Sequence, residues 1–538
     1  MTDERNRAHR STALVMASTL VSRLLGFVRI AVIGALFGAS GDADVLNLVF
    51  NIPNNLRKLL AEGALSSAFL PVLSRSHLED PGGAGSRTLV SQLIGFQLLI
   101  LLPLLVLSTV FAGPVVNTIL AFPEPERQVL AARLFRWLIH YVLLISVAAV
   151  LMGTLNSHHR FFLPAVAPLL FSAGVIGSVV FLHPYLGIFS MVVGVLLGGV
   201  GQLVIQVPSV RKMGYTLRPT FSFGDPRFRT VLKQWLPVLS TASIFAVDQQ
   251  IALFFASGLR DGSGSALTNA LVFWQLPFGI FSASITTVLF PLMSQQWARG
   301  DNAGLRVSVF GGLRSLALLL IPAAVALVVF GEPMIAVALQ RGAFTGGNTI
   351  MAARVLVGYS LGLFSVGAFT FLQRFFYAAG DYRTPLKVAL VTMVLDVSLS
   401  LVLKETPLEV AGLSVANSVA FTVGFLLLLY SAGRRIGAGG AVVYLPAVLR
   451  ALIASAGAAV AVLLLRGRIN LFNPGTPWWG PGSTLKSLVL LLLEGATALA
   501  ALLGVYRLLG IRILAILRRR GVHPESGESD SKGNDCER

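Results

Sequence analysis

The amino-acid sequence predicts an all-α polytopic membrane protein, a bundle of about 14 spanning helices. Of its 538 residues, 55% are apolar and only 12% are charged, whereas soluble domains usually contain about 25% charged residues. The apolar residues form continuous runs, each long enough at ~1.5 Å per residue to cross roughly 30 Å of hydrocarbon. These runs do not alternate polar and apolar residues as transmembrane strands do, so spanning strands are excluded.

The apolar runs follow one another with only short polar connections, which leave no room for a soluble catalytic domain. The first run follows several basic residues, as in a secretory signal, but it continues past Arg23 and Arg29 without a polar cleavage region. We therefore expect a retained first span, and an even number of spans that places both termini on one side. The expected spans are approximately residues 12–37, 45–74, 88–113, 129–153, 163–182, 186–208, 231–258, 265–296, 307–331, 350–378, 385–403, 410–432, 446–465 and 484–508.

The distribution of charge predicts the orientation in the membrane. The formal net charge is +18, from 42 Lys and Arg against 24 Asp and Glu, which in a soluble protein would suggest a nucleic acid partner. Here the basic residues gather at the termini and in every second connection, and the positive-inside rule therefore predicts cytoplasmic termini in a bacterial inner membrane, with no nucleic acid bound. Arg466 and Arg468, in an opposite connection, are an exception. The basic connections contain Arg75, Arg87, Arg160, Arg211, Lys212, Arg299, Arg383, Lys387, Arg434 and Arg435.

Two distant segments look alike and suggest an internal repeat. Leu48-Val-Phe-Asn-Ile-Pro53 resembles Leu271-Val-Phe-Trp-Gln-Leu-Pro277, and the prolines that follow these segments, Pro71 and Pro291, are 220 positions apart. Arg160-Phe-Phe-Leu-Pro164 and Asp381-Tyr-Arg-Thr-Pro385 repeat this offset to within one residue. Transporters built from such repeats bind substrate between the halves, where helices are bent. Pro53, Pro237 and Pro277 would free carbonyls there, although they can equally be ordinary kinks.

The repeat divides the chain into four expected parts. Residues 1–210 form an N-terminal lobe of six spans, residues 211–440 a second such lobe, residues 441–510 the last two spans, and residues 511–538 a cytoplasmic tail. The only cysteine, Cys536, lies in the polar end of this tail, whose composition suggests disorder. Disulfides and thiolate metal sites are therefore not expected.

Charged residues inside the spans are the strongest functional signal, because each costs about 2.5–3.5 kcal/mol at the centre of a helix. The first span contains Arg23 and Arg29, and the second contains Arg57, Lys58 and Glu62. Lys58 and Glu62 can pair as i and i+4, which leaves an excess of positive charge. Guanidinium groups are permanently charged and bind oxyanions with paired donors, so this cluster favours a phosphate or pyrophosphate ligand. The alternative is that Arg23 and Arg29 extend to the cytoplasmic interface.

Two lone carboxylates suggest a cation site for Na⁺ or H⁺. Asp248 falls in the seventh span and Asp396 in the eleventh, each among apolar residues, and Thr392 and Asn417 could add oxygen ligands. The alternative is that each carboxyl is protonated and only joins neighbouring helices. Glu494, in the last span, has no explanation from the sequence. Motifs of enzymes are missing, so we expect a transporter that is not an enzyme, with no cofactor beyond the coupling ion and no other metal.

Several segments match a known family signature in order and spacing. The most specific are Ser22-Arg-Leu-Leu-Gly-Phe-Val-Arg29, Asp42-Ala-Asp44, Asn51-Ile-Pro53-Asn-Asn-Leu-Arg57 and Ala61-Glu-Gly-Ala-Leu-Ser-Ser-Ala-Phe-Leu-Pro71. Arg341-Gly-Ala-Phe-Thr345 and Gly380-Asp-Tyr-Arg-Thr-Pro385 are shorter matches. Across essentially its whole length the chain resembles the MurJ/MviN family, the lipid II flippases of the multidrug/oligosaccharidyl-lipid/polysaccharide exporter superfamily.

The resemblance implies a fold, a substrate and a set of residue roles. It implies two six-helix lobes around a central cationic cavity, with the last two helices forming a groove for the undecaprenyl tail. Lipid II would move from the inner to the outer leaflet, through a protein that we expect to be a monomer among membrane lipids. The substrate residues would be Arg23, Arg29 and Arg57, with Ser22, Asn51 and Pro53 in the same motifs. Asp44 and Glu62 would serve in gating or positioning, and Asp248, Thr392, Asp396 and Asn417 would form a sodium site.

The chain departs from the family pattern at two positions. Many members carry a further essential arginine in the eighth span, where this chain has Val272, and an acidic residue where it has Ile30. An exporter of another lipid-linked oligosaccharide would keep the cationic cavity without the signature between Ser22 and Pro71. A cation-coupled multidrug antiporter would expose carboxylates to its substrates, and a non-transporting scaffold would tolerate loss of these arginines.

Overall fold

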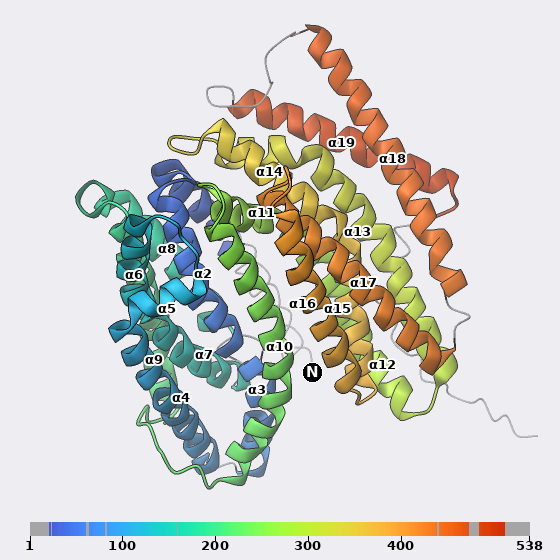
Figure 1. Cartoon of the computed structure of the whole chain (residues 1–538). Coiled ribbons are helices and arrows are strands. Elements are labelled where there is room, and N and C mark those ends of the chain that lie inside the picture. Colours follow the sequence, from blue (N-terminus) through green and yellow to red (C-terminus); the bar gives the residue numbers. More distant parts are fainter. Residues whose placement is uncertain are drawn as a thin grey trace, which may run out of the picture.

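The computed structural model describes residues 21–22, 24–60, 64–80, 83–158, 160–437, 441–472 and 484–511 (Figure 1). These residues form helices and turns without any β-strand, which confirms the predicted all-α class. A helix over Leu24–Phe37 comes first. It is followed by α2 (Asp42–Leu60), α3 (Ala64–Glu79), α4 (Ala84–Val110), α5 (Ala112–Ile119), α6 (Pro125–Leu138), α7 (Tyr141–Ser157), α8 (Phe162–Leu186), α9 (Phe189–Lys212), α10 (Pro226–Ser257), α11 (Ser263–Pro277), the π-helical turn η1 (Phe278–Ser282), α12 (Ala283–Ala298), α13 (Asn302–Leu339), α14 (Gly346–Leu361), α15 (Leu363–Ala378), α16 (Arg383–Leu403), α17 (Val410–Ile436), α18 (Ala441–Phe472) and α19 (Thr484–Leu508).

The helices are long and apolar enough for a protein that crosses the membrane many times. Within the described residues, 10 helical segments could each span a membrane, and the bent pair of α14 and α15 makes an eleventh. The remaining expected spans, 12–37, 45–74 and 231–258, coincide with helices whose described apolar parts are shorter or more polar. The polytopic class is therefore confirmed, but the expected total of about 14 spans is not.

The helices pack around two large apolar cores. The first core lies among α2 and α4 to α9, and includes the buried side chains of Phe135 and Val142. The second lies among α11 to α17, where Phe371 and Phe375 are fully buried. In Figure 1 the two groups of helices approach each other at the upper end of the molecule and diverge toward the lower end.

Two helices border both cores. In the helix over Leu24–Phe37, Phe27 packs against the second core and Val32 against the first. In α10, Leu253 belongs to the first core and Ala256 to the second. These helices therefore lie where the two groups meet.

Several helices are bent or broken within the bundle. Pro277 ends α11 and is followed by the π-helical turn η1, which widens the helix locally. The axes of α14 and α15 differ by 47° across Gly362. Side chains of other helices bind carbonyls near this bend: Trp274 donates to Tyr359 O at 3.0 Å, and Ser418 donates to Gly358 O at 2.6 Å. Pro53 lies inside α2.

The hairpin of α8 and α9 is closely packed through glycines. A Cβ atom on Gly194 would lie 2.8 Å from Val175 Cα, and one on Gly198 would lie 2.9 Å from both Cα and O of Phe171. Small residues four positions apart let the helix backbones approach this closely. The packing also fixes Phe171, which contacts one of the predicted substrate residues.

We predict that Gly198→Ala destabilises the protein, whereas Gly177→Ala on α8 does not. Both changes favour the helix by the same amount, about 1 kcal/mol, because alanine has a higher helix propensity than glycine. The new Cβ clashes with neighbouring atoms at residue 198 but meets nothing within 4 Å at residue 177. Overpacking costs about 1–3 kcal/mol. Thermal unfolding in detergent should therefore give a lower Tm for Gly198→Ala alone. Equal Tm values for the two variants would contradict the close packing of α8 on α9.

Candidate functional site

Arg29 lies among neutral partners between the two groups of helices. Its guanidinium carbon is 5.0 Å from the centre of the Phe171 ring, and its Nη1 is 3.5 Å from Ser172 Oγ, both on α8. An aromatic face and a hydroxyl stabilise the cation without cancelling its charge. Arg29 therefore keeps its positive charge at this depth.

Arg57 adds a second positive charge to the same region. It lies on α2, where its Nε donates to Asn54 Oδ1 at 3.1 Å. Arg29, Arg57 and Tyr141 on α7 lie close enough to one another for their charged forms to interact electrostatically. Two like charges in a medium of low dielectric repel, so an anion placed between them stabilises both.

Sequence reasoning missed Tyr141 and Ser172, because neutral residues inside apolar spans form no distinctive pattern. Among the predicted residues of this region, Asn51 donates to the carbonyl of Asn47 on its own helix at 2.8 Å, and Pro53 is buried in α2. Ser22 is half-buried. Two predicted residues, Arg23 and Glu62, and the side chain of Lys58 lie outside the described residues, so the expected pair of Lys58 and Glu62 is not tested.

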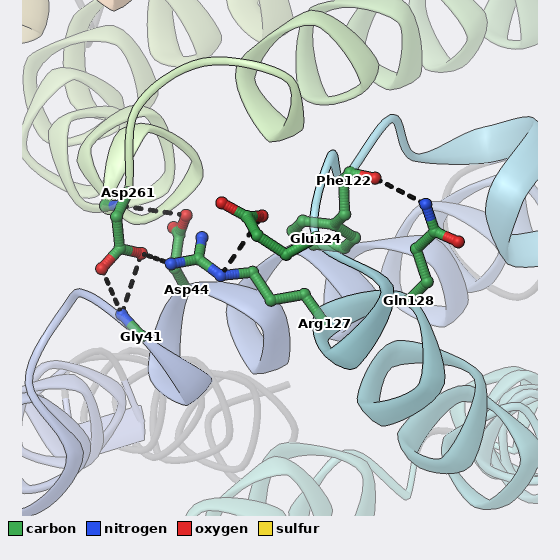
Figure 2. Close-up of polar contacts among 8 residues, drawn as sticks. Gly41, Asp44, Phe122, Glu124, Arg127, Gln128 and Asp261 are labelled. Carbon is green, nitrogen blue, oxygen red and sulfur yellow. Dashed lines mark hydrogen bonds and ion pairs between the residues drawn. The ribbon is translucent and has the colours of Figure 1, made fainter.

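A reciprocal pair of helix caps joins α2 to α11 (Figure 2). Asp44 accepts hydrogen bonds from the backbone N–H groups of Gly262, at 3.1 Å, and Ser265, at 2.6 Å. In return, Asp261 accepts from Gly41 N with both carboxylate oxygens, at 2.9 and 2.8 Å. Each aspartate thus satisfies N–H groups at the start of the other helix, which have no partner within that helix.

The caps join positions that the internal repeat predicts to be equivalent. Gly41 and Asp261 are 220 positions apart, and Asp44 and Ser265 are 221 apart, close to the offset of 220 read from the prolines. Contacts of this kind, in which each copy binds the same part of the other, are expected where two repeats meet about a pseudo-two-fold axis. The charge distribution predicts that this end of the molecule is the extracytoplasmic end.

Further contacts reinforce the same end. Arg127 on α6 bonds Asp261 at 3.0 Å and approaches Glu124 at 3.6 Å (Figure 2), and Arg260 pairs with Glu409 at 2.7 Å. Exposed ion pairs contribute only about 0–1 kcal/mol each. We therefore expect the buried cap formed by Asp44, which has 2% of its surface exposed, to provide most of the closure.

A backbone contact also crosses between the groups at this end. Ala343 N donates to Ala35 O at 2.9 Å. Its neighbour Gly342 has a φ of +56°, and a Cβ atom there would clash with the same carbonyl. This explains the glycine in the Arg341-Gly-Ala-Phe-Thr345 motif, since only glycine fits both the conformation and the close approach.

The two predicted cation-site carboxylates face each other. Asp248 on α10 and Asp396 on α16 lie next to each other, close enough for their carboxyl groups to interact. Asn417 on α17 donates to Asp396 Oδ2 at 2.7 Å. Thr392 is buried one turn before Asp396, and its hydroxyl donates to Val388 O at 2.9 Å. The structure thus brings three of the four predicted residues into contact, with Thr392 beside them.

Ser400 is an additional member of this group that the sequence analysis did not identify. Its hydroxyl is 3.3 Å from Asp396 Oδ1. The signal was its position four residues after Asp396 on the same helix, where side chains are neighbours.

The Gly380-Asp-Tyr-Arg-Thr-Pro385 motif holds the start of α16, the helix that carries Asp396. Asp381 accepts from the N–H groups of Arg383 and Thr384, both at 3.0 Å, from the Thr384 hydroxyl at 2.6 Å, and from Arg435 on α17. Partial burial alone would raise the pKa of Asp381, but the Thr384 hydrogen bonds and the Arg435 charge lower it below its usual value. The carboxylate therefore stays ionised as the cap of α16.

The sequence model of the lipid II flippase MurJ matches residues 33–489, most of the chain. A probable lipid II flippase MurJ from Borreliella burgdorferi is 33% identical over 510 residues, which cover 95% of this chain and 98% of the relative. The chain belongs to the MurJ family of lipid II flippases. The lipid II flippase MurJ of Burkholderia cenocepacia is 30% identical over 434 residues, covering 79% of this chain and 84% of the relative. The predicted family is thus confirmed.

Solved structures agree with the MurJ fold. A lipid II flippase MurJ in an inward closed conformation gives a TM-score of 0.74 at 24% identity, over 92% of this chain and 99% of that chain. A multidrug resistance MATE family transporter of the MOP superfamily, in an inward-facing conformation, gives a TM-score of 0.61 at 16% identity. The match covers 78% of this chain and 95% of that chain. This chain therefore shares its fold with both of these transporters.

We predict that Asp44→Ala opens the extracytoplasmic end. The change leaves the N–H groups of Gly262 and Ser265 without their caps, which costs about 1–2 kcal/mol. We expect a cysteine at the buried position Ala266, in a Cys536→Ser background, to react about 5- to 30-fold faster with a membrane-impermeant maleimide added to cells. Asp42→Ala, at an exposed position of the same helix turn, is the control. Equal labelling rates in the two variants would rule out a gating role for Asp44.

Proposed function

We propose that this protein moves lipid II from the inner to the outer leaflet of the bacterial cytoplasmic membrane by alternating access. The observation that carries the proposal is the pair of Arg29 and Arg57, two interacting charges at the meeting point of the helix groups. Guanidinium groups suit the pyrophosphate of lipid II, because they bind oxyanions with paired donors and cannot lose their charge. Membership of the MurJ family supports the same substrate.

In this proposal the headgroup crosses between the helix groups while the prenyl tail stays in the lipid. The caps at Asp44 and Asp261 close the path on the extracytoplasmic side, so the state described here would receive its substrate from the cytoplasmic side. The protein binds and releases lipid II without making or breaking covalent bonds. We further propose that it works as a monomer surrounded by membrane lipids, with both termini in the cytoplasm.

The family resemblance implies an arginine in the eighth span where this chain has Val272. Val272 packs against the second core, so α11 adds no cation there. Arg29 and Arg57, with Arg23, would therefore carry the phosphate contacts alone. Tyr141, whose hydroxyl lies near both described arginines, is positioned to contribute a neutral donor.

Two other functions fit the fold less well. A cation-coupled drug antiporter shares the superfamily fold, but the charges between the helix groups near Tyr141 are positive and would repel cationic drugs. An exporter of another lipid-linked oligosaccharide would use the same arginines, since its cargo also carries a pyrophosphate. Only the cargo distinguishes it from the proposed function.

We predict that Arg57→Ala abolishes the restoration of outer-leaflet lipid II. The assay measures exposed lipid II in bacteria depleted of their own flippase and expressing this protein at equal membrane levels. Loss of a charge-assisted hydrogen bond costs about 1.5–3 kcal/mol, a fall of roughly 10- to 100-fold in transport. Arg133→Ala, which removes an arginine that stacks on Phe189 away from this site, should keep wild-type exposure. A well-inserted wild type that restores no exposure would favour another lipid-linked cargo.

We also propose that Asp248, Asp396, Asn417 and Thr392 bind the coupling cation, Na⁺ in exchange with H⁺. The closeness of the two carboxyls supports this, because two adjacent carboxylates repel unless a proton or a cation lies among their oxygens. If Asn417 turns its amide, its oxygen becomes a further ligand. No nucleotide-binding motif occurs in the sequence, so the cation gradient or the membrane potential would drive transport.

We predict that sodium stabilises the wild-type protein and does not stabilise Asp396→Asn. Replacing KCl by NaCl at constant ionic strength should raise the wild-type Tm, because the folded state alone forms the site. Ser400→Ala should weaken the response, whereas Ser398→Ala, on the exposed face of the same helix, should leave it intact. A wild-type Tm that is the same in both salts would argue for coupling to protons alone.

A further inference from the structure

Glu494, which the sequence left unexplained, is the carboxylate half of a buried ion pair. It lies on α19 with 0% of its side chain exposed, and Arg466 on α18 binds both its oxygens, Nε at 2.9 Å and Nη2 at 2.8 Å. Bidentate pairing of this kind holds both side chains in one geometry. It also accounts for Arg466 as an exception to the charge distribution, since this arginine is neutralised within the bundle.

Arg466 makes a third polar contact, to the backbone of α13. Its Nη2 donates to Val329 O at 3.1 Å, and its guanidinium lies 5.7 Å from the centre of the Phe330 ring. Val329 is four residues before Pro333, which has no N–H to donate to that carbonyl. The arginine thus supplies the hydrogen bond that the proline removes.

The same arrangement occurs a second time on α13. Tyr506 of α19, 1% exposed, donates its hydroxyl to Leu318 O at 2.8 Å. Leu318 is four residues before Pro322, the other proline inside α13. Both carbonyls freed by prolines in this helix are therefore bound by side chains of the α18–α19 hairpin.

The two contacts are well separated along the helices. Leu318 and Val329 are roughly 16 Å apart along α13, and Glu494 and Tyr506 roughly 18 Å apart along α19. Alanines on α18, among them Ala451 and Ala454, pack in one apolar cluster with Leu318 and Tyr506 at the second contact. An attachment at two separated points fixes both the position and the tilt of the hairpin.

We propose that Pro322 and Pro333 create two docking points for the α18–α19 hairpin, and that Arg466, Glu494 and Tyr506 are positioning residues that keep it on α13 during transport. A backbone carbonyl that has lost its helical N–H partner inside the membrane needs another donor, because no water is present there to bind it. The hairpin supplies that donor only while docked. It therefore moves with α13 when the helix groups rearrange, a consequence that rests on the proposed transport function.

The first test measures the position of the hairpin directly. Spin labels at the exposed positions Val307 on α13 and Leu464 on α18, in a Cys536→Ser background, report their separation by pulsed electron resonance. The wild type should give one narrow distance distribution. The triple variant Arg466→Met, Glu494→Met and Tyr506→Phe, which leaves no buried lone charge, should broaden it and lose most lipid II transport. An unchanged narrow distribution, or unchanged transport despite broadening, would overturn the proposal.

The second test separates carbonyl binding from simple packing. Tyr506→Phe should lower the Tm in the wild-type background, and much less in a Pro322→Ala background, where the backbone N–H gained at position 322 can bond Leu318 O. Equal losses in both backgrounds would show that the tyrosine acts by packing alone and would refute the docking point. Tyr430→Phe, at an exposed position of α17, is the control and should leave the Tm unchanged.

The spin-label experiment still tests the docking of the hairpin if the proposed cargo is wrong. A wild type that moves no lipid II but keeps the narrow distance would refute the transport proposal and leave the docking intact. A wild type that transports lipid II but gives a broad distance distribution would support the transport proposal and refute the docking. The spin-label measurement therefore judges the hairpin independently of its substrate.

Discussion

A backbone N–H or carbonyl group inside a membrane must find a partner within the protein, and this chain breaks its helices in several places. At several of these breaks and helix ends, a side chain from a distant part of the sequence supplies the partner. Trp274 binds the carbonyl of Tyr359 beside the bend of α14 and α15, and Arg466 binds that of Val329. Asp44 caps the first N–H groups of α11. The tertiary structure therefore depends on these exchanges as much as on apolar packing.

The same constraint governs the charges. A charge at the middle of a spanning helix costs about 2.5–3.5 kcal/mol. Two arginines in the helices of this protein are stabilised by different kinds of partner. Arg466 is neutralised by Glu494 and serves the structure. Arg29 is stabilised by a ring and a hydroxyl, which leave its charge in place. The difference in partners separates a structural arginine from one that can attract an anionic substrate.

The sequence predicted the features that a single segment encodes. Apolar length gave the helical class, and isolated charges identified Arg29, Arg57, Asp248 and Asp396. It could not pair Glu494 with Arg466 or Tyr506 with a carbonyl, because such contacts depend on how distant helices pack. The reciprocal caps could be predicted only in part. The repeat offset of 220 was visible in the sequence, but nothing in the local sequence indicated that equivalent helix ends contact each other.

The helices that are joined by these caps, at the end predicted to be extracytoplasmic, also carry the arginines. Asp44 and Arg57 share α2, roughly 20 Å apart at 1.5 Å per residue, and Arg29 shares its helix with Ala35, whose carbonyl crosses to Ala343. Hydrogen bonds of about 0.5–1.5 kcal/mol each make the closure worth only a few kcal/mol. In the proposed function, one pyrophosphate would neutralise two repelling charges and release energy on the same scale. Because rigid helices join both sites, substrate binding can shift the equilibrium between closed and open ends without a separate transmission element.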